Sequence, residues 1–95
     1  MRKHGKVDAN HAEIVAALRR MGCSVISLAP IGGGCGDILV GRRGINLMFE
    51  IKDGSKPPSE CELTHDEKIF HAQWAGQIST VYSAREAIEL VRIKT

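Results

Sequence analysis

The chain has 95 residues, 43% of them hydrophobic and 25% charged, which is the composition of a single globular domain spanning 1–95. It contains no apolar run of membrane length and no signal-peptide pattern, so we expect a cytoplasmic protein. Its three cysteines lack the spacing of a disulfide framework or a zinc ribbon, and Cys61, His65 and His71 fit no standard zinc pattern.

The first predicted element is an amphipathic helix over 12–21, which ends at Gly22. Asn10 and Glu13 have the spacing of a weak capping box at its start. Glu13 is therefore open to two roles, a helix cap or an acid of the active site. A strand over 23–28 follows the helix.

A glycine-rich loop separates this strand from the next one. The loop has neither the dinucleotide-binding fingerprint nor a phosphate-binding lysine, so it is a weak nucleotide signal. Gly33 and Gly34 are better candidates for a mobile loop that meets nucleic acid.

A hairpin is predicted where two apolar segments flank the turn Gly41-Arg42-Arg43-Gly44. A symmetric turn pairs Val40 with Ile45 and makes Asp37 and Glu50 diagonal neighbours, roughly 7–8 Å apart at the backbone. Because side chains alternate along a strand, Met48, Glu50 and Lys52 then share the face of Asp37. The opposite face is a buried wall made of Ile38, Val40, Ile45, Leu47, Phe49 and Ile51.

Two carboxylates and one lysine on a single face suit metal-assisted cleavage of a phosphodiester bond. Mg²⁺ prefers oxygen ligands and keeps several waters, so Asp37, Glu50 and a backbone carbonyl leave room for a phosphate and an attacking water. Lys52 would position or deprotonate that water, or neutralise the charge on the phosphate. Glu-x-Lys segments are common, and the simpler interpretation is an exposed ion pair. The charges within an otherwise apolar strand favour the site.

The remaining elements complete the order αβββαβα. A loop at 56–60 precedes a helix over 63–75, a short strand over 78–82 and a helix over 83–93. Thr64 with Glu67 and Ser83 with Glu86 form capping boxes, so both glutamates are interpreted as caps. Phe70 and Trp74 share one side of their helix, and we predict that they are core residues in preference to residues that stack on nucleic-acid bases. The fold class is α/β (α+β layered), a mixed sheet flanked by helices.

Positive charge is clustered although the net charge is only +2. The clusters are Arg2-Lys3 with Lys6, Arg19-Arg20 and Arg42-Arg43. Such clusters contact nucleic-acid phosphates in some proteins and are only a solvated basic surface in others, and here the two interpretations are equally supported.

The element order and the set Asp37 … Glu50-x-Lys52 resemble the PD-(D/E)XK nuclease superfamily, which has a restriction-endonuclease-like αβββαβ core. More narrowly, the chain resembles stand-alone VRR-NUC domains of phages and bacteria. The resemblance rests on Gly36-Asp37-Ile38-Leu39-Val40, Phe49-Glu50-Ile51-Lys52, Leu63-Thr64, Trp74-Ala75-Gly76 and the final strand and helix.

This resemblance implies a Mg²⁺- or Mn²⁺-dependent DNA endonuclease selective for branched structures such as four-way junctions, acting as a homodimer. By position, Asp37, Glu50 and the Ile51 carbonyl would bind the metal. Lys52 would be the catalytic lysine, and Glu13 matches a frequent acidic position.

Two residues depart from the family pattern. Gly36 stands where proline is usual, which we expect to cost little. Glu67 replaces a frequent glutamine, with Gln73 further along, so the role of that helix is open. The alternatives to a nuclease are an inactive nucleic-acid-binding module of the same fold and a small α/β interaction protein.

Overall fold

A computed structural model describes residues 9–95, so the cluster at Arg2, Lys3 and Lys6 lies outside the described residues. The helices are α1 (His11–Arg20), α2 (His65–Gln73) and α3 (Ala84–Lys94), with a 3₁₀ turn at Pro58–Glu60 in the expected loop. The strands are β1 (Ser24–Ser27), β2 (Ile38–Arg42), β3 (Ile45–Ile51) and β4 (Ser79–Val81). The predicted order of elements is confirmed.

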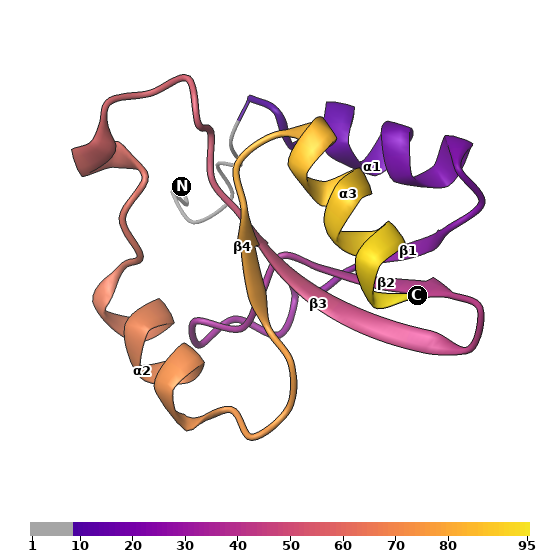
Figure 1. Ribbon diagram of the computed structural model, residues 1–95. Coiled ribbons are helices and arrows are strands. Elements are labelled where there is room, and N and C mark those ends of the chain that lie inside the picture. The colour runs from indigo at the N-terminus through magenta and orange to yellow at the C-terminus, as the bar shows by residue number, and fades with distance from the viewer. Residues whose placement is uncertain (1–8) are drawn as a thin grey trace.

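The four strands form one mixed sheet in the order β1-β2-β3-β4 (Figure 1). β2 pairs antiparallel with both β1 and β3, whereas β3 and β4 are parallel. The parallel pair requires a long crossover, and α2 lies within it. The α/β class with a mixed sheet is therefore confirmed.

The β2–β3 turn is tighter than predicted. Only Arg43 and Gly44 form it, with φ angles of 55° and 79°, and Arg42 pairs with Ile45. Positive φ at both positions is typical of a two-residue type I′ hairpin, whose twist matches that of the strands. The predicted pairing of Val40 with Ile45 is wrong by two residues, since Val40 pairs with Leu47. Because side chains alternate with a period of two, this error leaves every face unchanged.

The hydrophobic core lies between one face of the sheet and helices α1 and α3 (Figure 1). Phe49 is fully buried on that face, and Ile14 of α1 and Val91 of α3 are buried against it. Ile45 differs from the prediction: it is 42% exposed, because it lies beside the turn. No helix among residues 9–95 is long and apolar enough to cross a membrane.

Helix α2 lies apart from this core (Figure 1). It has no buried residue, so the prediction that Phe70 and Trp74 are core residues is wrong. Trp74 is 46% exposed, and the two rings stack on each other with centroids 5.2 Å apart. The spacing correctly indicated a shared side of the helix, but the core is already covered by α1 and α3.

Candidate functional site

The two strand carboxylates and the lysine come together at one end of the β2–β3 pair. Oδ2 of Asp37 accepts a hydrogen bond from the backbone N–H of Ile51 at 2.7 Å. Nζ of Lys52 lies 3.8 Å from Oε2 of Glu50. Glu50 and Lys52 are 2% and 9% exposed, which makes them the buried charged residues of 9–95. The simpler interpretation of an exposed ion pair is therefore wrong.

A fourth member of the site comes from α2. Oε1 of Glu67 accepts a hydrogen bond from Nζ of Lys52 at 2.8 Å and another from the backbone N–H of Thr64 at 2.9 Å. The predicted capping box of Glu67 is confirmed, and its bond to Lys52 is an additional finding. We call Asp37, Glu50, Lys52 and Glu67 the Lys52 cluster. The bond between Lys52 and Glu67 joins α2 to the polar end of β3.

The electrostatics of the Lys52 cluster favour a proton on Glu50. Burial, followed by the charge of Asp37, a hydrogen bond with Asp37 and the charge of Glu67, raises the pKa of Glu50 to about 10, and Lys52 offsets only part of this. Burial also acts to raise the pKa of Glu67, but hydrogen bonds from Lys52 and Thr64 outweigh it and lower that pKa. Charged Glu67 and Lys52 thus form an ion pair beside a neutral Glu50.

The donor atoms around Asp37 and Glu50 fit a hard divalent cation. Oε1 of Glu50 is buried without a hydrogen-bond partner, a costly state that a cation would relieve. The N–H of Lys52 donates to Val81 on the β4 side, so the trans peptide directs the carbonyl of Ile51 toward the Asp37 side. Among residues 9–95 no group of three or more His, Cys, Asp or Glu side chains is arranged to hold a metal. Two carboxylates and a carbonyl are the set that the geometry offers.

The glycine-rich loop that contains Gly33 and Gly34 lies against α2, beside the Lys52 cluster. A Cβ on Gly34 would lie 2.6 Å from the backbone carbon of Asp66, closer than side chains approach, and 3.0 Å from the nitrogen of Glu67. Gly34 also has a φ of +85°, which favours glycine. Its neighbour Gly33 has a similar φ of +66° but meets nothing within 4 Å.

Gly34→Ala is therefore expected to push the loop away from α2 and to disturb Glu67. We expect a larger loss of stability than that caused by Gly33→Ala, which also has a positive φ but lacks the collision. The urea unfolding midpoints of the two variants check this. Equal midpoints would show that the contact between loop and helix does not contribute to stability.

Glu13 does not join the Lys52 cluster. It is exposed on α1 and lines a hollow of about 700 Å³ with residues such as Asp53, Ser55 and Arg85. The Asn10 cap prediction is wrong, since no side-chain cap bond is made. The amide of Asn10 instead donates to the carbonyls of Lys52 and Tyr82, both at 3.1 Å, and so ties α1 to the ends of β3 and β4.

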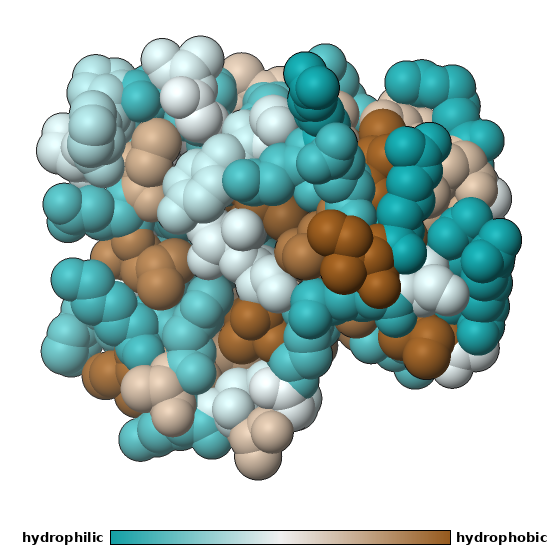
Figure 2. Space-filling model, viewed as in Figure 1, coloured by the Kyte–Doolittle hydropathy of each residue, from teal (hydrophilic) through white to brown (hydrophobic). Residues whose placement is uncertain are grey.

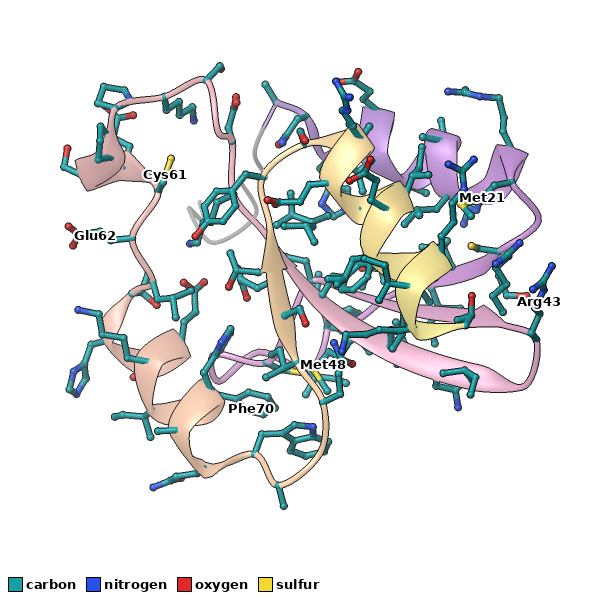
Figure 3. All side chains as sticks on the ribbon, viewed as in Figure 1. Met21, Arg43, Met48, Cys61, Glu62 and Phe70 are labelled. Carbon is teal, nitrogen blue, oxygen red and sulfur yellow. The ribbon has the colours of Figure 1, made fainter. Side chains whose placement is uncertain are left out.

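The four predicted phosphate-binding arginines also lie away from the cluster. Arg19 and Arg20 are in the last turn of α1, and Arg42 and Arg43 are at the hairpin turn, at the opposite end of β3 from Glu50. Figure 3 shows Arg43 pointing outward at this end. Gln73 is exposed at the end of α2.

Comparison of the chain with protein-family models, with curated proteins and with solved structures found no match.

Proposed function

We propose that the protein is a Mg²⁺- or Mn²⁺-dependent DNA endonuclease that hydrolyses phosphodiester bonds at the Lys52 cluster. One observation carries the proposal: a buried lysine and two adjoining buried or half-buried carboxylates at the polar end of an apolar strand. Burying such groups is costly, and the cost is expected where a site holds a cation and a phosphate.

In this proposal each residue of the cluster has a defined task. Asp37, Glu50 and the carbonyl of Ile51 would hold the metal, which supplies Lewis acidity and an acidified water when bound. Lys52 would place its ammonium against the phosphate and stabilise the charge that develops on its oxygens. Glu67 keeps that ammonium charged and directed, since it accepts a 2.8 Å hydrogen bond from it.

The finer features rest on the family resemblance of the motifs. They are selectivity for branched DNA such as four-way junctions, a homodimer that cuts two strands symmetrically, and action in the cytoplasm. The exposed apolar side chains of Ile69 on α2 (41% exposed) and of Trp74 just after it (46% exposed) support a surface that a second copy covers.

The second candidate is a nucleic-acid-binding module of the same fold without activity. The observation in its favour is the Glu67 carboxylate, which already occupies one side of the Lys52 ammonium. A glutamine at position 67 would leave the charge of Lys52 available to a phosphate, whereas the carboxylate of Glu67 competes with the phosphate for that charge.

The decisive experiment is cleavage of a labelled panel by purified protein. The panel comprises a four-way junction, a splayed arm, a flap, a duplex and a single strand, each with EDTA, Mg²⁺ or Mn²⁺. We expect metal-dependent cutting, with the junction preferred, and none in EDTA. Binding without cutting of any substrate would establish the second candidate, and cutting in EDTA would contradict the metal site.

A further inference from the structure

Three segments that are distant in the sequence meet at the end of the molecule opposite the Lys52 cluster. Gly41 of β2 pairs with Ser24, just beyond the end of α1, and Arg42 donates a 2.9 Å hydrogen bond to the hydroxyl of Thr95, just beyond α3. The β2–β3 turn and the ends of α1 and α3 therefore form one surface (Figure 1).

This surface is strongly basic. Segments 18–24, 41–46 and 91–95 contain no acidic residue. Hydrophilic side chains gather along this edge of the molecule, at the right in Figure 2. We call it the basic end, and its members are Arg19, Arg20, Arg42, Arg43, Arg92 and Lys94.

The charge of the described residues is thus separated between the basic end and the remainder. Among residues 9–95 the basic end holds six of the ten lysines and arginines, and the other four face all ten aspartates and glutamates, a net charge of −6. The overall value of +2 for the whole chain hides this separation. A polyanion approaching the protein is therefore attracted to the basic end and not to the acidic Lys52 cluster.

Favourable interactions with helix dipoles account for only some of the cations of the basic end. Cations in the last turns of α1 and α3 oppose the negative end of each helix dipole. Arg42 and Arg43 belong to no helix. Arg43 moreover has a φ of 55°, a conformation in which asparagine or glycine is strongly preferred at a type I′ turn. A charge is therefore present here at a cost in backbone energy.

We infer that the basic end binds the phosphate backbone of duplex DNA, at a contact region separate from the Lys52 cluster. From Ile45 to Glu50 the strand extends five residues, or roughly 17 Å, at about 3.3 Å per residue. Duplex DNA rises about 3.4 Å per base pair, so a duplex that lies along β3 would meet the basic end about five base pairs from the bond at the cluster. This position rests on the proposed function, whereas the binding itself does not.

The test compares two double variants that lose the same charge. Arg20→Gln with Arg43→Asn removes two exposed cations of the basic end, and asparagine suits the backbone at position 43. Lys68→Gln with Arg85→Gln removes two exposed cations elsewhere. Binding of a labelled duplex is titrated against salt concentration in EDTA, where no metal is available.

Each phosphate contact contributes about −0.9 to the slope of log affinity against log salt concentration. We therefore expect this slope to become less negative by roughly 2 in Arg20→Gln with Arg43→Asn, and to change very little in Lys68→Gln with Arg85→Gln. Equal losses in both variants, an unchanged slope in the first, or no binding by the wild type would overturn the inference. If the wild type binds with the expected slope but cuts no DNA with Mg²⁺ or Mn²⁺, the nuclease proposal fails and the basic end stands. If the wild type cuts DNA but the salt slope of Arg20→Gln with Arg43→Asn equals that of the wild type, the nuclease proposal stands and the basic end fails.

Discussion

Lys52→Gln is expected to slow the proposed metal-dependent DNA cleavage by roughly 100- to 1,000-fold, the cost of removing one group that stabilises charge in a transition state. Glutamine lacks the positive charge but still has an N–H donor for Glu67, so the half-buried carboxylate of Glu67 keeps a partner. Activity should fall while the fold persists.

Single-turnover cleavage at saturating Mg²⁺, beside the urea unfolding midpoint, measures this effect. Lys68→Gln is the matched control, because Lys68 is exposed on α2, one residue after Glu67. A rate for Lys52→Gln within a few-fold of the wild type would show that the ammonium takes no part in the reaction.

The metal-free protein is expected to lose stability as the pH rises. The pKa of Glu50 is about 10 in the folded state against an ordinary 4.5, so the folded state binds one proton more than the unfolded state between these values. The stability contributed by this proton is fully present below about pH 4.5 and is lost as the pH rises toward 10. The limiting slope for one proton is about 1.4 kcal/mol per pH unit.

Urea unfolding in EDTA from about pH 6 to pH 9 checks this slope. Glu50→Gln removes the titrating group and should give a nearly flat profile, with higher stability than the wild type at high pH. Mg²⁺ should stabilise the wild type most at high pH, because the ion replaces the proton, and should not stabilise Glu50→Gln. A wild-type profile as flat as that of the variant would contradict the raised pKa.

The side chains that share the polar face could be predicted from sequence, because the alternation of a strand is independent of the length of its turn. The pairing of Val40 was wrong by two residues, yet Asp37, Glu50 and Lys52 still lie together. A one-residue error would have placed them in the core. Registers that differ by an even number of residues are indistinguishable from the pattern of hydrophobic residues alone.

The role of Glu67 could not be predicted in full, because a capping box is a local pattern that accounts for the residue by itself. Its bond to Lys52 joins residues fifteen positions apart, and it depends on where α2 lies relative to the sheet. The periodicity of hydrophobic residues does not show where α2 lies relative to the sheet. The exposure of Trp74 was missed for the same reason.

Gly36 also has a stricter role than its sequence context suggests. A Cβ there would lie 2.8 Å from Cγ of Met48 and 3.1 Å from the carbonyl oxygen of Phe49. Proline, expected to be nearly equivalent, would collide with these atoms. Glycine at this position is therefore matched by the methionine that faces it.

The amide of Gln77 completes the edge of the sheet where β4 is too short. β4 pairs with β3 only from Phe49 onward, and Gln77 accepts from the N–H of Met48 at 2.7 Å and donates to its carbonyl at 3.0 Å. One side chain thus occupies both hydrogen-bonding groups that another strand would otherwise use. Unpaired strand edges are templates for aggregation, and Gln77 shortens the edge that this protein offers to strands of other molecules.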